Sequence, residues 1–130
     1  CFSNFQQLFA EGQEFSYDLR DVGLYYRDYV RLMHHWDEVL PGRVHRLQHE
    51  ALLDDFEGEL RRLLDYLELP FETSCLRYYE SDRAVRTPSS EQVRRPLYRD
   101  AVDKWQNYAD WLQPLRDALG DCVQPALSGT

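Results

Sequence analysis

The segment Asp18–Leu40, DLRDVGLYYRDYVRLMHHWDEVL, carries the clearest helical pattern in this chain of 130 residues. Its apolar side chains recur at intervals of three and four residues, which is the pattern of a helix with one buried face. Asp18 stands at the position of a helix N-cap, and Pro41-Gly42 predicts the end of the helix. The expected apolar face comprises Val22, Tyr25, Tyr26, Tyr29, Met33, Trp36 and Leu40.

Four other segments show apolar residues at helical spacing, so we expect a mainly α fold with about five helices. The second of these segments should begin at Asp54, because Glu57 three residues later completes a capping-box pattern. Pro114 predicts either a kink in the last segment or two shorter helices that meet there, and Gly120 is its expected end. The four segments are residues 1–10, 54–67, 72–80 and 101–119.

Arg43–Gln48, with Val44 and Leu47 as its apolar residues, is the expected single short strand. One strand cannot make a sheet, so its partners should lie in another chain or in sequence outside these 130 residues. The chain also begins at Cys1 rather than at a methionine. Both features favour the interpretation that the chain is a fragment of a longer domain, with a loose tail over residues 121–130.

Composition and charge exclude several classes of function. No stretch approaches 18 apolar residues and the mean hydropathy is -0.65, so no membrane span is expected. A net charge of -8 disfavours binding to nucleic acid or to an anionic membrane surface. The three cysteines are widely spaced and no secretory signal is present, so we expect a reducing, cytoplasmic location.

Positive charge is nevertheless concentrated in residues 83–99, which hold five arginines against one glutamate. Arginine suits bidentate contact with phosphate, so this stretch predicts a site for a small, highly charged anion. A general preference for arginine codons would give the same composition without a site. The arginines are Arg83, Arg86, Arg94, Arg95 and Arg99.

The run SSEQ that begins at Ser89 has the pattern of a helix N-terminus, with Ser89 as the cap and Gln92 in third position. Free backbone N–H groups at such an end bind anions, and Arg94 and Arg95 follow within about one turn. Lys104 comes a few turns later. The alternative is an ordinary capped helix with solvated arginines.

The histidines do not predict a metal site. His34 and His35 are adjacent, so on a helix they point in different directions. His49-Glu50 begins an HExxH pattern, but Leu53 stands where the second histidine would be required. No GxSxG, phosphate-binding loop or GxGxxG motif occurs, and no catalytic residue is assigned. A cysteine paired with a histidine stays open as a nucleophilic alternative.

The run SSEQVRRPLYRDAVDKW, residues 89–105, resembles the C-terminal segment of sulfotransferases that use PAPS (3′-phosphoadenosine 5′-phosphosulfate). The branch concerned includes protein-tyrosine sulfotransferases and related bacterial enzymes. Three other stretches resemble that family in the same order along the chain. They are CFSNFQQLF at 1–9, YYRDYVRLMHHWDEVLPGRV at 25–44 and LQHEALLDDFEGELRRLLDYLELPFE at 47–72.

The resemblance implies roles for eight residues. Ser3 matches a serine that binds the 3′-phosphate, and Lys104 matches a cofactor-binding lysine. His49 stands where the family often has a tyrosine near the adenine, and Gln7 stands where tyrosine sulfotransferases have an arginine. The loop that closes over the nucleotide is matched by Ser89, Gln92, Val93, Arg94 and Arg95.

The resemblance further implies that residues 1–120 are the C-terminal part of an α/β, P-loop-like sulfotransferase domain. PAPS and its product adenosine 3′,5′-bisphosphate would be the ligands, and a hydroxyl or amine would accept the sulfuryl group. The family's phosphosulfate loop and catalytic base are absent from the chain. We therefore expect the isolated chain to be inactive and to bind the nucleotide weakly or not at all.

Two alternatives carry no catalysis. One is a small acidic helical module that forms homo-oligomers through an apolar face exposed by truncation. The other is an acidic helical domain without a ligand. The residues expected on the exposed face are Phe2, Phe5, Leu8, Phe9, Val44 and Leu47.

Overall fold

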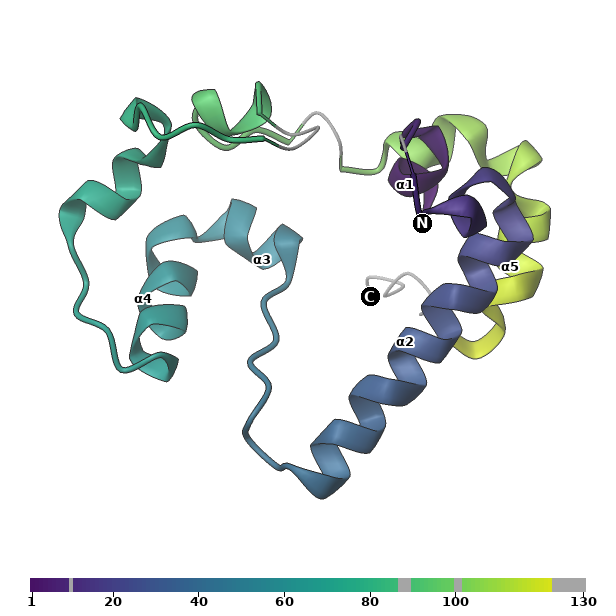
Figure 1. Ribbon diagram of the computed structural model, residues 1–130, viewed down its shortest axis with the longest axis horizontal. Helices are drawn as coiled ribbons and strands as arrows, with labels where there is room; N and C mark the ends of the chain where they lie inside the picture. Colours follow the sequence, from purple (N-terminus) through teal and green to yellow (C-terminus); the bar gives the residue numbers. More distant parts are fainter. Residues whose placement is uncertain (10, 87–89, 100–101, 123–130) are drawn as a thin grey trace, which may run out of the picture. The chain divides into compact units, whose positions relative to one another are not determined.

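The computed structural model describes residues 1–9, 11–86, 90–99 and 102–122, and Figure 1 shows its elements. These residues form helices joined by turns and irregular segments, and no strand occurs among them. The predicted mainly α fold is therefore confirmed. The chain divides into two compact units, with residues 1–44 and 103–130 in unit 1 and residues 45–102 in unit 2.

Each unit contains both α-helices and short 3-10 helices, the latter labelled η. Unit 1 holds α1 (Phe2–Gln6), η1 (Glu14–Tyr17), α2 (Leu19–Val39), η4 (Lys104–Trp111), α5 (Gln113–Leu119) and η5 (Gly120–Cys122). Unit 2 holds α3 (His49–Asp54), α4 (Phe56–Tyr66), η2 (Thr73–Glu80) and η3 (Gln92–Arg94).

Helix α2 begins and ends where the sequence predicts. An Oδ1 atom of Asp18 accepts hydrogen bonds from the backbone N–H groups of Arg20 at 2.7 Å and Asp21 at 3.1 Å. Such a cap stabilises a helix by about 1 kcal/mol, because it satisfies N–H groups that have no partner inside the helix. The helix ends at Val39, and Gly42 follows in the left-handed conformation that glycine adopts without strain.

The buried core lies in unit 1, where α2 packs against α5. Val22, Leu112, Leu115 and Ala118 are its buried apolar residues. The predicted apolar face of α2 is buried only in part: Val22 is buried and Met33 and Trp36 are half-buried, whereas Tyr25 is 58% exposed. The physical reason is length, because α5 has seven residues and can cover only part of a helix of 21.

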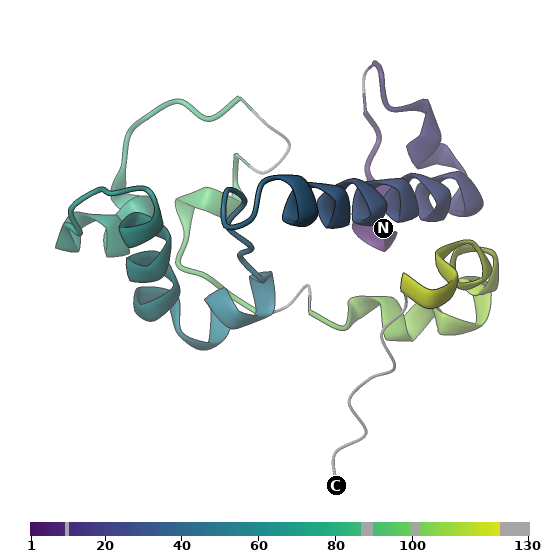
Figure 2. The ribbon, with the colours of Figure 1, turned by 90° about the horizontal axis from the view of Figure 1, so that it is seen from below.

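Gly23 sets the distance between α2 and α5, which lie side by side in Figures 1 and 2. A Cβ atom at Gly23 would lie 2.6 Å from the Cβ of Ala118 and 3.2 Å from the carbonyl oxygen of Leu115. The first distance is well inside van der Waals contact. The two backbones can therefore approach as they do only because residue 23 has no side chain.

The last predicted helix consists of two shorter ones, which is one of the two outcomes that Pro114 implies. The break falls at Leu112, between η4 and α5, and Pro114 occupies the first turn of α5. Proline is tolerated there because the first N–H groups of a helix have no partner within it. Gly120 ends α5 with a positive φ of 51°, as predicted.

One predicted element was wrong, and the start of another is shifted by one residue. Arg43–Gln48 is not a strand but turns and irregular backbone, since no described segment pairs with it. The helix expected from Asp54 begins one residue later, because Asp55 is the cap and its Oδ1 accepts from Gly58 N at 2.9 Å. A separate helix, α3, precedes it. Residues 123–130 of the expected tail lie outside the described residues, and the domain boundary at residue 120 stays a prediction.

Replacing Gly23 with alanine should lower the free energy of unfolding by about 1–2 kcal/mol. Overpacking costs about 1–3 kcal/mol and exceeds the roughly 1 kcal/mol that alanine gains over glycine inside a helix. Urea unfolding of Gly23→Ala, Ala118→Gly and the double variant measures the coupling between the two positions. Removal of the Ala118 methyl should relieve the defect, and strictly additive effects would contradict the close approach.

Candidate functional site

Unit 2 contains a hollow of about 180 Å³, here called the tyrosine hollow, that combines residues from three elements. His49 is the first residue of α3, Tyr78 comes from η2, and Gln92 and Val93 come from η3. Thus segments far apart in the sequence meet at one place. The full lining is His49, Tyr78, Gln92, Val93, Leu97 and Tyr98.

Polar contacts hold the segment after η3 against the rest of unit 2. The hydroxyl of Tyr78 donates a hydrogen bond of 3.0 Å to the carbonyl oxygen of Arg95. The guanidinium of Arg99 pairs with the carboxylate of Asp54, the last residue of α3. The Tyr78 ring also meets the Phe56 ring edge-on, with centroids 5.7 Å apart. These contacts determine where residues 95–99 run beside α3 and η2.

The phenol of Tyr78, in the lining of the tyrosine hollow, has a raised pKa. Partial burial raises the pKa of its phenol above the ordinary value of 10.0, and the nearby phenols of Tyr79 and Tyr98 act in the same direction. Desolvation disfavours the phenolate, and so do neighbouring groups that become negative. The hydroxyl therefore stays protonated and continues to donate to Arg95 well above neutral pH.

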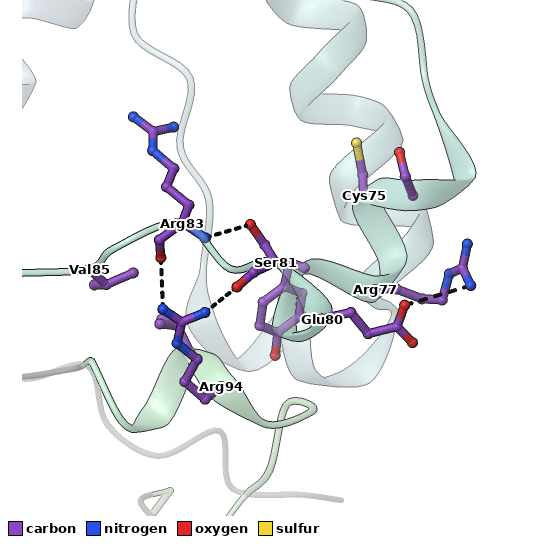
Figure 3. A pocket seen from close by; sticks show the side chains of 10 residues that line it. Cys75, Arg77, Glu80, Ser81, Arg83, Val85 and Arg94 are labelled. Carbon is purple, nitrogen blue, oxygen red and sulfur yellow. Dashed lines mark hydrogen bonds and ion pairs between the residues drawn. The ribbon is translucent and has the colours of Figure 1, made fainter.

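A second hollow of about 640 Å³, here called the arginine hollow, is lined by η2, the segment after it and η3 (Figure 3). It shares Tyr78 and Val93 with the tyrosine hollow. Arg94 closes one side, because its guanidinium donates to the backbone carbonyls of Ser81 and, at 2.8 Å, of Arg83. One side chain thus fixes the course of the segment that follows η2.

The structure brings together some of the residues that the resemblance singles out. His49, Gln92 and Val93 line the tyrosine hollow, and Arg94 lines the arginine hollow. Arg95 lines neither hollow, and its guanidinium lies over the ring of Tyr98, 3.7 Å from the centroid. This arrangement places five of the eight residues, His49, Gln92, Val93, Arg94 and Arg95, in unit 2.

Ser3 and Lys104 both lie in unit 1, on elements that touch each other. Ser3 belongs to α1 and Lys104 begins η4. Phe2, next to Ser3, packs on Tyr108 of η4 with ring centroids 4.9 Å apart. Both site residues are exposed. The contact between their elements was not foreseen from the residues themselves.

The α-helix predicted to start at residues 89–92 is not found in the described residues. Ser89 lies outside the described residues, and Gln92 does not stand in the third position of a helix but begins a 3-10 turn of three residues. Arg95 is extended, and Pro96 follows it. A proline disfavours helical backbone at the residue before it, so the turn cannot extend through Arg95. The described residues 90–99 therefore contain no α-helix N-terminus that could bind an anion.

Tyr78, Leu97 and Tyr98 line the tyrosine hollow but were not predicted as site residues. Their positions in the sequence give no periodic or motif signal, and their role arises only because η2 and residues 97–98 are close in space. The exposed apolar face expected for self-association stays a prediction. Its residues fall in both units, and Leu8 is 81% exposed whereas Phe2 is half-buried and packs against the core of unit 1.

Within the described ranges, no group of three or more His, Cys, Asp or Glu side chains could hold a metal ion. The three cysteines are free and partly buried. No described helix is long and apolar enough to cross a membrane.

Comparison with known proteins identifies the family. A model of the sulfotransferase family matches residues 1–73, more than half of the chain, and the chain therefore belongs to the sulfotransferase family. An uncharacterized protein of Aquifex aeolicus (strain VF5) is 38% identical over 120 residues, which are 90% of this chain. The chain spans only 16% of the length of that relative. No solved structure gives a significant match.

Replacing Arg94 with lysine should loosen the segment after η2. A lysine ammonium group lacks the planar, two-pronged geometry by which the guanidinium donates to both carbonyls. About 1 kcal/mol of local stability should therefore be lost at this exposed site. That loss corresponds to about fivefold faster tryptic cleavage after Arg83. The matched control is Arg95→Lys, which changes the neighbouring arginine but leaves both carbonyl contacts in place. Equal cleavage rates in the two variants would contradict the role of Arg94.

Proposed function

We propose that this chain contributes the adenine and 3′-phosphate side of the nucleotide site of a PAPS-dependent sulfotransferase. The co-substrate would supply the sulfuryl group, and an acceptor hydroxyl or amine would receive it. The acceptor itself is not defined by the residues described. Membership of the sulfotransferase family supports the class of reaction, and the roles of the individual residues rest on the resemblance described above.

The observation that carries the proposal is the convergence of His49, Gln92 and Val93 on one hollow. The resemblance assigns His49 to the adenine and the other two to the loop over the nucleotide, without regard to any structure. Their meeting in the fold is an independent observation, because α3 and η3 are separated by more than half of unit 2 in sequence.

The chemistry of the tyrosine hollow fits a purine base. Its volume of about 180 Å³ lies below the roughly 300–1,000 Å³ of pockets that take whole small molecules, so it suits one part of a nucleotide. The rings of His49, Tyr78 and Tyr98 are surfaces on which a base can stack. The Gln92 amide offers both a donor and an acceptor to the edge of a base.

The 3′-phosphate would be held by Ser3 and Lys104. Their side chains are exposed, and their elements touch through Phe2 and Tyr108. Lys104 has no carboxylate partner among the described residues, so its ammonium group is available to an oxyanion. A serine hydroxyl and an ammonium group supply one neutral and one charged donor to a phosphate.

Thermal unfolding with two nucleotides tests the proposal. Adenosine 3′,5′-bisphosphate at about 100 times Kd should stabilise the chain by about 2.7 kcal/mol, which raises Tm by roughly 10 °C. Adenosine 5′-monophosphate, which lacks only the 3′-phosphate, should give a smaller shift at the same concentration. The difference between the two nucleotides should disappear in Lys104→Ala.

Histidine variants provide the matched control. His49→Ala should weaken binding of both nucleotides, because the base loses one of its stacking partners. His34→Ala removes an exposed histidine of α2, outside the tyrosine hollow, and should leave both shifts unchanged. Because the chain alone is expected to bind weakly, the same measurements are repeated with the chain joined to a phosphosulfate-loop segment of the family. The proposal fails if neither nucleotide shifts the Tm of that joined protein, or if His34→Ala and His49→Ala have the same effect.

A further inference from the structure

The arginine hollow is larger than the proposed nucleotide function requires. Its volume of about 640 Å³ falls within the range of pockets that bind whole small molecules. Three arginines and one carboxylate line it: Arg77, Arg83, Arg94 and Glu80. The hollow is therefore electropositive, although the chain as a whole carries a net charge of -8.

The three arginines are not equally available to a ligand. Arg77 is paired with Glu80 at 3.6 Å, and Arg94 donates to the carbonyls of Ser81 and Arg83. The guanidinium of Arg83 has no carboxylate partner in the described part of the chain. One guanidinium thus keeps its full capacity to bind an anion.

The backbone of Arg83 is fixed on both sides. Its N–H donates to the hydroxyl oxygen of Ser81 at 3.3 Å, and its carbonyl accepts from Arg94 at 2.8 Å. Figure 3 shows the side chain of Arg83 extending away from the carbonyl that Arg94 holds. A charged group on a fixed backbone loses less conformational freedom when it binds a ligand, which favours affinity.

The rest of the wall combines two serines, Ser74 and Ser81, with four less polar residues. Cys75, Tyr78, Val85 and Val93 line the hollow, and each is half-buried. A bare oxyanion would fill a small part of 640 Å³ and would leave these groups in contact with water. A ligand with an apolar body and one anionic end can cover the less polar side chains of the wall and also pair with the guanidinium of Arg83.

We propose that the arginine hollow binds an organic carboxylate, with the carboxylate paired to Arg83 and the apolar body packed against Val85 and Val93. A single free guanidinium matches a monoanionic carboxylate through two parallel hydrogen bonds. A phosphate dianion would call for additional cations, and the other two arginines are already engaged. This site does not depend on the proposed nucleotide function.

Alkylation of Cys75 reports occupancy, because its thiol lies in the wall of the arginine hollow. The probe is 1-naphthoate, and its uncharged counterpart is 1-naphthamide, which has nearly the same shape. Iodoacetamide labelling followed by peptide mass spectrometry gives separate rates for Cys75, Cys1 and Cys122. At about nine times Kd, linkage predicts about tenfold slower labelling of Cys75 with 1-naphthoate. Labelling of Cys1 and Cys122 should not change.

Two arginine variants separate the bound carboxylate from general surface charge. Arg83→Gln should abolish the protection of Cys75, and Arg83→Lys should retain it at a weaker affinity, because the charge remains but the planar fork is lost. Arg86→Gln is the matched control: it removes an exposed arginine three residues later that does not line the hollow, and protection should persist. Thermal unfolding checks that each variant is folded.

The proposal is supported if 1-naphthoate protects Cys75, 1-naphthamide does not, and Arg83→Gln removes the effect. Equal protection by both probes, no protection by either, or protection that survives Arg83→Gln would overturn it. Adenosine 3′,5′-bisphosphate is tested in parallel. If it protects Cys75 and competes with 1-naphthoate, the hollow belongs to the nucleotide site and a separate carboxylate site is excluded.

Discussion

The position of residues 92–99 in unit 2 depends on hydrogen bonds between side chains and backbone. The helix in this stretch has only three residues, and the buried apolar residues of the described chain all lie in unit 1. Three contacts hold the stretch in place: Arg94 on the carbonyls of residues 81 and 83, Tyr78 on the carbonyl of Arg95, and Arg99 on Asp54. Both hollows exist because these contacts are made.

Attachment by a few hydrogen bonds, as seen for residues 92–99, suits a segment that covers a ligand. Each such hydrogen bond contributes about 0.5–1.5 kcal/mol net, and somewhat more where one partner is charged, so the segment is held without a packed core beneath it. Local opening then costs much less than global unfolding. Unit 1 differs in this respect, because α2 and α5 are in such close contact at Gly23 that there is little room for an added side-chain atom. We propose that the tethered segment covers the base.

Local signals in the sequence were sufficient to predict part of this structure. Asp18 and Pro41-Gly42 set the two ends of α2 because capping and chain termination depend on neighbouring residues only. Pro114 and Gly120 likewise determined how the C-terminal helices divide and end. Signals of this kind act within a few residues and need no knowledge of the fold.

Other features could not be predicted because they depend on contacts between distant segments. The strand at Arg43–Gln48 required a pairing partner, and none occurs in the described chain. The run at 89–92 has the composition of a helix start, yet Pro96 and the carbonyl contacts of Arg94 favour a single turn. Tyr78 and Tyr98 became site residues only through the meeting of η2 with the segment after η3.

Hydrogen–deuterium exchange of the chain with and without adenosine 3′,5′-bisphosphate tests the central claim most directly. If the nucleotide binds as proposed, exchange should slow in peptides covering residues 49–54, 92–99, 1–6 and 104–111, which carry the proposed contacts. Peptides from the C-terminal half of α2 should be unaffected, apart from any global stabilisation seen equally throughout the chain. Unchanged exchange at residues 49–54 and 92–99, with the nucleotide saturating, would contradict the account.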